Sequence, residues 1–176
     1  GNGRCGSTYV CEQLEIEPDV LLTAKGLGNG LPIGVCMARG EAAQLLGPGD
    51  HGSTYGGNPL CCAAAIAVLT SLRDDNVMQR ASIVREVLLT ALHQTIAQPD
   101  LITEVRGSGL MIGIQPSVAT KEIVQRGLDR GLLINVAGGD TIRVLPPLVM
   151  TDEQAGELGA GIANIINDIA EQENAL

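Results

Sequence analysis

Three short stretches of the chain hold residue types that could do chemistry. Lys25 stands in "LLTAKGLGNGLPIG", between an apolar run and a glycine-rich loop. Ser53 and Thr54 stand in "HGSTYGGNP", and Arg143 is the single charged residue of "TIRVLPPL". An amine, two hydroxyls and a guanidinium suit a carbonyl group, a phosphate and a carboxylate, respectively.

Lys25 is one of only two lysines in the chain. Burial at the end of a strand would lower the pKa of its amine and make the amine nucleophilic. Such a lysine can form a Schiff base with a carbonyl compound. The alternative is an ordinary surface lysine that follows a strand, and the stretch taken alone leaves both open.

The loop of residues 51–59 ends where a helix is expected to begin, at Asn58-Pro59. Ser53, Thr54 and free backbone N–H groups there could bind phosphate oxygens. An ordinary polar turn before a capped helix is the alternative. Arg143 on a rigid strand could bind a carboxylate through two parallel hydrogen bonds, or it could be an edge-strand arginine that reaches water.

The hydrophobic pattern predicts the elements that position these residues. The expected helices cover residues 60–72, 77–97, 120–130 and a last segment capped by Thr151, with a helical turn or two over 41–46. Expected strands cover 20–23, 33–38, 132–136 and 141–145, with two β segments over 102–115. In the helix over 120–130 we expect Ile123, Val124 and Leu128 to face inward. The first part of the chain is thus loops and strands that lead into a helix, and the second is an α+β unit.

The bulk composition excludes several classes of protein. A net charge of -9 argues against nucleic acid as a partner, and the apolar runs are too short to span a membrane. No signal peptide is visible, and five cysteines without framework spacing suit reduced thiols in a cytoplasmic protein. Two histidines and the cysteine spacing predict no metal site.

Three separated segments then resemble one family. "EPDVLLTAKGLGNGLPIG", "HGSTYGGNPLCCAAA" and "LLINVAGGDTIRVLPPL" are similar, in this order, to segments of the class III, pyridoxal-phosphate-dependent aminotransferases. The last segment most resembles the acetylornithine branch of that family. The resemblance extends over almost the whole chain, and its order makes a chance similarity very unlikely.

The resemblance implies a fold and roles for the site residues. It implies the α/β fold type I of these transferases, with residues 1–70 as the end of the large cofactor domain and the start of the interdomain helix. Residues 71–176 would be the small C-terminal α+β domain. By the same resemblance, Lys25 would hold pyridoxal 5'-phosphate in a Schiff base, Thr54, with Ser53 beside it, would bind the cofactor phosphate in the partner's site of a homodimer, and Arg143 would bind the substrate carboxylate.

The reaction implied is transamination of N-acetylornithine with 2-oxoglutarate, a cytoplasmic step of arginine biosynthesis. Ornithine, succinylornithine and 4-aminobutyrate aminotransferases share the same motifs, and the family also includes an aminomutase and a decarboxylase. Relatives carry an aspartate, a phosphate loop and a stacking aromatic residue upstream of "GNGRCG", so we expect this chain to be a C-terminal portion. A non-catalytic structural fragment is the alternative from another class.

Overall fold

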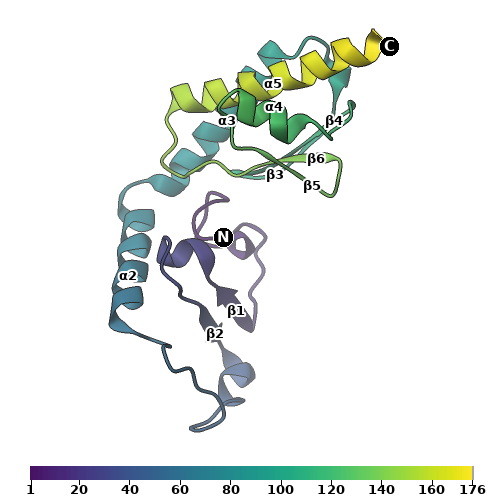
Figure 1. Cartoon of the computed structure of the whole chain (residues 1–176). Helices are drawn as coiled ribbons and strands as arrows, with labels where there is room; N and C mark the ends of the chain where they lie inside the picture. Colours follow the sequence, from purple (N-terminus) through teal and green to yellow (C-terminus); the bar gives the residue numbers. More distant parts are fainter. Residues whose placement is uncertain (176) are drawn as a thin grey trace. The chain divides into compact units, whose positions relative to one another are not determined.

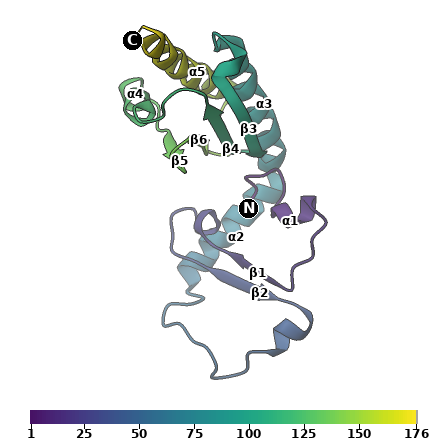
Figure 2. The ribbon, with the colours of Figure 1, turned by 90° about the vertical axis from the view of Figure 1, so that its right-hand side faces the viewer.

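The computed structural model describes residues 1–175, which divide into two compact units. The first unit comprises residues 1–3 and 7–78, and the second comprises residues 4–6 and those from Gln79 onward. Strands β1–β6 and helices α2–α5 are labelled in Figure 1, and α1 is labelled in Figure 2. Each unit has its own secondary structure and its own buried residues, so each is described by itself.

The first unit is built from a two-stranded sheet and one long helix. Strands β1 (Val20–Thr23) and β2 (Val35–Ala38) pair antiparallel, and Figure 2 shows them side by side. A 3-10 turn, η1 (Lys25–Gly28), follows β1 directly and packs against helix α2 (Pro59–Asp74). Two short segments complete the unit, α1 (Val10–Gln13) and η2 (Gly40–Gln44).

Helix α2 begins where its capping residues require. Asn58 is extended and its Oδ1 accepts a hydrogen bond from Cys61 N at 3.0 Å. Pro59 occupies the first turn, where its missing N–H is no loss. Helix α3 (Val77–Thr95) begins in the first unit and continues into the second. Both helices confirm the prediction from the hydrophobic pattern.

The second unit is a four-stranded antiparallel sheet with helices on one side (Figure 1). The strand order is β3 (Ile102–Ser108), β4 (Met111–Pro116), β6 (Thr141–Val144) and β5 (Asn135–Ala137). Helices α3, α4 (Ile123–Asp129) and α5 (Asp152–Asn174) cover the sheet, and η3 (Pro99–Leu101) leads into β3. The core holds the fully buried side chains of Val84, Leu88, Leu92, Leu110, Ile114, Ile142, Ile162, Ile165 and Ile166, among others.

Small residues let two helices of this unit approach closely. A Cβ atom at Gly159 of α5 would lie 2.1 Å from the carbonyl oxygen of Leu88 on α3. Only glycine fits at that contact, because no heavy atom can lie so close to a backbone oxygen. The N-terminus of α5 carries the expected capping box, in which Thr151 and Gln154 exchange side-chain-to-backbone hydrogen bonds.

Helix α4 corrects two sequence expectations. It is shorter than the predicted 120–130, and Val124 and Leu128 are exposed instead of facing inward. The buried residues are Ile123 and Gly127, and a Cβ atom at Gly127 would lie 2.8 Å from Cγ1 of Ile134. The face of α4 that carries Gly127 therefore packs closely against Ile134. Hydrophobic periodicity cannot predict this contact, because glycine is not counted as a hydrophobic residue.

Candidate active site

Lys25 is placed at a sharp change of backbone direction in the first unit. It follows β1 and opens η1 with a left-handed φ of 53°. Asn2 holds the backbone just before it, because its Nδ2 donates to the Ala24 carbonyl at 2.8 Å and its Oδ1 accepts from the Thr23 hydroxyl at 2.9 Å. The position of the lysine backbone is therefore well defined by local hydrogen bonds.

The buried strand expected before Lys25 is not what the structure shows. Only Thr23 of β1 is buried, and Leu22 is 75% exposed. The reason is that β1 and β2 form a sheet of only two strands. The Lys25 side chain is exposed, and within residues 1–175 it forms neither a hydrogen bond nor an ion pair. Its amine is available to a ligand.

Asn2 was missed by sequence reasoning. It lies far from Lys25 in the sequence, in a segment that reads only as a loop, and no local pattern connects the two. The glycine-rich character of the segment was the one available signal. The backbone at Gly3 lies very close to Leu72, because a Cβ atom at Gly3 would be 2.6 Å from Cδ2 of Leu72. A backbone segment packed so closely is usually held by further contacts.

Ser53 and Thr54 lie in the loop that leads into α2. Gly56 N donates to the Ser53 carbonyl at 3.2 Å, which closes a turn, and the Asn58 side chain donates to the Tyr55 carbonyl at 3.0 Å. Both hydroxyl residues are exposed, and their side chains have no hydrogen-bond partner within the described part of the chain. The loop therefore presents two free hydroxyls just before a helix N-terminus.

Arg143 lies on β6 in the second unit. Its neighbours Ile142 and Val144 are buried in the core, so alternation along the strand turns Arg143 to the other face of the sheet. Its Nε donates to Oδ1 of Asn135 at 3.2 Å. The strand β6 is paired on both sides, by β4 and β5, so the alternative is wrong in placing Arg143 on an edge strand. The guanidinium is exposed.

The structure places the predicted residues in two groups. Lys25, Ser53 and Thr54 belong to the first unit, and Arg143 belongs to the second. No hydrogen bond joins Lys25 to Ser53 or Thr54 among residues 1–175. Each of these four side chains is accessible, and none is engaged by a residue that would exclude its predicted role. The four roles stay predictions.

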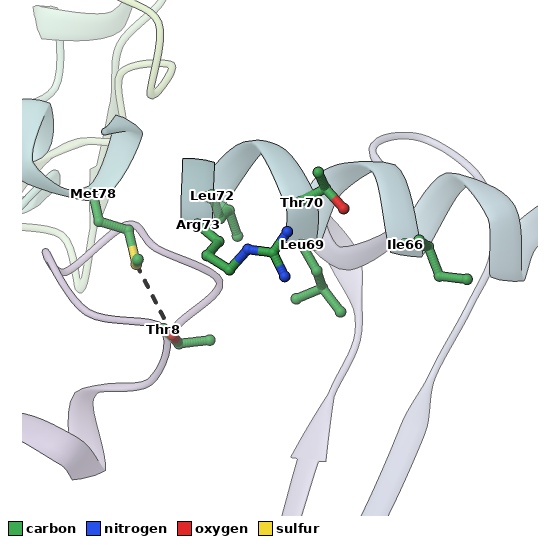
Figure 3. Close-up of a pocket in the computed structure, with 7 residues that line it drawn as sticks. All are labelled: Thr8, Ile66, Leu69, Thr70, Leu72, Arg73 and Met78. Carbon is green, nitrogen blue, oxygen red and sulfur yellow. Dashed lines mark hydrogen bonds between the residues drawn. The ribbon is translucent and has the colours of Figure 1, made fainter. Parts of the chain in front are cut away.

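The first unit also contains an open hollow of about 410 Å³, shown in Figure 3. Most of its lining residues come from α2, and its Arg73 forms a two-pronged hydrogen bond with Asp74. None of the predicted site residues lines it. The lining residues are Thr8, Ile66, Leu69, Thr70, Leu72, Arg73 and Met78.

Metal binding and membrane spanning find no support among the described residues. Within residues 1–175 there is no cluster of three or more histidine, cysteine or acidic residues that could hold a metal ion. None of the helices described is long and apolar enough to cross a membrane. None of the five cysteines forms a disulfide bond, and Cys5 and Cys61 are buried as small hydrophobic residues.

Comparison with known proteins agrees with the motifs. The family model described as "Aminotransferase class-III" matches residues 1–166. The acetylornithine aminotransferase of Mycobacterium tuberculosis strain H37Rv is 43% identical over 168 residues, which is 95% of this chain and 42% of that protein. The chain therefore spans less than half the length of this curated relative.

Solved structures show the same fold. The acetylornithine aminotransferase from Elizabethkingia anophelis has a TM-score of 0.84 and 33% identity, covering 96% of this chain and 43% of that chain. A structure of the ornithine aminotransferase from Toxoplasma gondii, described with partial occupancy of pyridoxal phosphate at its active site, has a TM-score of 0.90 and 31% identity, covering 99% and 42%. The fold is that of the fold type I pyridoxal-phosphate-dependent transferases, as expected.

The resemblance first noted in three separated motifs is thus confirmed by a match that runs nearly from end to end, and the chain belongs to the class III aminotransferases.

Proposed function

We propose that the chain is the C-terminal portion of an aminotransferase that uses pyridoxal phosphate to transfer an amino group between N-acetylornithine and 2-oxoglutarate. The observation that carries the proposal is the 43% identity, over 95% of the chain, to a protein named acetylornithine aminotransferase. In the proposed enzyme the first unit is part of the cofactor domain and the second unit is the small domain. The enzyme would act in the cytoplasm, in arginine biosynthesis.

The residues present fit pyridoxal phosphate. Its aldehyde needs an amine that no carboxylate engages, and the exposed Lys25 has no ion-pair partner in the described part of the chain. Its phosphate needs hydroxyl and N–H donors, and in a homodimer the loop with Ser53 and Thr54, beside the N-terminus of α2, would supply them to the cofactor in the partner's site. When bound, pyridoxal phosphate supplies an electron sink for the negative charge that develops at the substrate Cα.

Lys25 has two tasks in this proposal. Its Nζ would hold the cofactor covalently when no substrate is present. With the substrate amine bound in its place, the free Nζ would serve as the base that removes the proton from the substrate Cα. Hydrogen bonds from Asn2 to the preceding residues fix the backbone from which the side chain must swing.

Thr54 and Arg143 bind the two ends of the reacting system. Thr54, with Ser53 beside it, is proposed to bind the cofactor phosphate in the partner's site of a homodimer, which suits two hydroxyls that are exposed and unengaged within residues 1–175. Arg143 is proposed to hold the substrate α-carboxylate. Fixing that carboxylate orients the Cα–H bond for proton removal.

Chemical trapping on Lys25 tests the covalent step. The intact protein that contains this chain is loaded with pyridoxal phosphate, reduced with borohydride, digested and analysed by mass spectrometry. We expect the adduct on Lys25, and we expect Lys25→Ala to abolish the visible absorption band of the bound cofactor. Lys121→Ala changes the only other lysine of the chain and should leave the band unchanged. An adduct on Lys121, or a band that survives Lys25→Ala, would refute the assignment.

Glutamate formation tests the substrate. Purified protein is supplied with 2-oxoglutarate and, in separate reactions, with N-acetylornithine, ornithine, succinylornithine or 4-aminobutyrate. The proposal expects the highest kcat/KM for N-acetylornithine. It also expects Arg143→Ala to lower kcat/KM by roughly a hundredfold or more, because a charge-assisted pair of hydrogen bonds is lost. A higher kcat/KM for another donor would replace the substrate assignment and keep the family.

A non-catalytic structural fragment is the second candidate, and the observation that favours it is that the chain spans only 42% of the length of the curated relative. The 176-residue chain is mixed with pyridoxal phosphate under the same trapping conditions. Efficient labelling of Lys25 by this chain alone would count against the non-catalytic candidate.

A further inference from the structure

We propose that Asn135 is a positioning residue for Arg143, which it orients without neutralising its charge, so that the guanidinium is ready to bind a carboxylate. The inference rests on the proposed function, because it concerns the same arginine. It adds a residue of the small, edge-lying strand β5 to the substrate site.

The two residues are direct cross-strand partners. Asn135 of β5 is in register with Arg143 of β6, so the two side chains leave the sheet on the same face. The amide oxygen of Asn135 accepts the hydrogen bond from Nε of Arg143 at 3.2 Å. Neither terminal nitrogen of Arg143 has a hydrogen-bond partner within residues 1–175. The two terminal nitrogens, which would bind a carboxylate, are therefore free, while the hydrogen bond to Nε holds the guanidinium group in place.

A second arginine on the same face of the sheet shows the opposite arrangement, in which a carboxylate engages the guanidinium. Arg106 of β3 lies in the same cross-strand row, but Glu104 binds its Nη1 at 2.6 Å. Gln115 and Thr141 accept from the two terminal nitrogens of Arg106 at 3.0 Å and 2.7 Å, respectively. Arg106 is thus paired with a carboxylate and hydrogen-bonded through both of its terminal nitrogens, whereas the partner of Arg143 is a neutral amide that leaves its positive charge uncompensated.

The residue that pairs with Arg143 on its other side is a glycine, which has no side chain to contact the arginine. Gly113 of β4 pairs with Arg143 on the side away from Asn135. A Cβ atom at Gly113 would lie 3.1 Å from Cγ2 of Thr141 and 3.3 Å from Cγ of Arg106, so the space is already tightly filled on that side. Arg143 therefore has one neighbouring side chain across the sheet, and that side chain is Asn135.

This arrangement serves anion binding for two physical reasons. A free arginine side chain loses rotamer freedom when it binds, and a hydrogen bond to Nε removes part of that loss in advance. An acidic residue at position 135 would also hold Nε, but it would compete with the substrate for the positive charge. A neutral acceptor gives orientation and leaves the charge for the ligand.

The experiment measures binding of glutarate, an unreactive dicarboxylate, to the intact protein by calorimetry. Asn135→Asp keeps an acceptor of the same shape and adds a charge, and Asn135→Leu removes the acceptor. We expect the glutarate Kd to rise roughly tenfold in Asn135→Asp and about three- to tenfold in Asn135→Leu. Asn164→Asp, which adds the same charge at an exposed position of α5, should change it less than about twofold. Melting curves identify a variant that does not fold.

Each outcome decides the inference. If Arg143→Ala weakens glutarate binding but both Asn135 variants bind like the wild type, the inference is overturned while the carboxylate role of Arg143 stands. If the wild type does not bind glutarate, both are overturned. If Asn164→Asp weakens binding as much as Asn135→Asp, general charge is the cause and the positioning role falls. If glutarate binds with the expected pattern but no transamination occurs, the proposed reaction fails and the role of Asn135 stands.

Discussion

The two units differ in how they bury apolar side chains. In the second unit Leu88, Leu110 and Ile166 are completely buried in one continuous core. In the first unit large apolar or aromatic side chains remain in contact with water, with Leu22 75%, Leu46 68% and Tyr55 82% exposed. Within this chain the large continuous core therefore lies in the second unit.

This difference separates most of the predicted site residues from the main core of the chain. Three of the four predicted site residues stand in the unit with little core, on loops and turns whose side chains are exposed. The fourth, Arg143, stands on a strand that a complete core supports. We therefore expect the second unit to fold and hold its arginine unaided, and the first to gain order from what binds it.

The largest effect is expected where the second unit is packed most tightly. Gly159→Val would force a side chain into the space of the Leu88 backbone and should lower the free energy of unfolding by about 4 kcal/mol or more. Gly156→Ala on the same helix meets no atom within 4 Å and should stabilise by up to about 1 kcal/mol. Denaturant unfolding followed by circular dichroism measures both. Similar stability for the two variants would contradict the close contact between α3 and α5.

Truncation of one leucine in each unit tests the comparison directly. Leu88→Ala removes a fully buried side chain of α3 and should cost about 3 kcal/mol. Leu60→Ala truncates a side chain of α2 that is 69% exposed, and in this chain alone it should change stability by less than about 0.5 kcal/mol. Unfolding in urea provides the values. A large loss from Leu60→Ala would mean that the first unit has a core of its own.

Two helix caps separate stability from ligand binding. Asn58→Ala and Thr151→Ala each remove a side chain that caps a helix N-terminus, and each should cost about 1 kcal/mol. Only Asn58 also holds the loop of Ser53 and Thr54, through its hydrogen bond to Tyr55. Pyridoxal-phosphate titration of the intact protein should therefore show weaker binding for Asn58→Ala and not for Thr151→Ala. Equal affinities would indicate that the cap does not order the loop.

The smallest effect concerns a surface ion pair of the first unit. The hydrogen bond from Arg39, followed by its positive charge, holds the pKa of Glu17 below the ordinary range. A carboxyl whose pKa is lower in the folded state stabilises above its unfolded pKa, and this contribution disappears as the pH falls through the folded pKa. Nuclear magnetic resonance titration of Glu17 should show the lowered pKa, and salt should shift it back. An unshifted Glu17 would mean that the pair does not persist in solution.

Local patterns predicted the elements well but could not predict their surroundings. The strand over 20–23, the α2 and α3 helices and the capping box of Thr151 follow from short-range rules of hydrophobic period and capping. The exposure of Leu22 does not, because burial depends on what packs against a strand. The same limit explains the error on Val124 and Leu128, where a glycine contact decided which face of α4 turns inward.

The candidate site shows a similar division. Lys25, Ser53, Thr54 and Arg143 could be proposed as site residues because each stands in a stretch of unusual composition. Asn2 and Asn135 were not, because their roles come from hydrogen bonds to residues distant in the sequence or across a sheet. Strand alternation could have suggested Asn135, since register pairs in a hairpin around "AGGD" can be counted outward from the turn.

The left-handed backbone of Lys25 sets stability against activity at a single position. The left-handed conformation costs a residue with a Cβ atom about 1 kcal/mol more than it costs glycine. Lys25→Gly should therefore make the chain more stable, at the expense of the amine needed for the proposed activity. Selection for folding alone would favour glycine here, as it would at Gly30 nearby with its φ of 106°. A lysine in this conformation is what the proposed role of its amine would require, whatever the preference of its backbone.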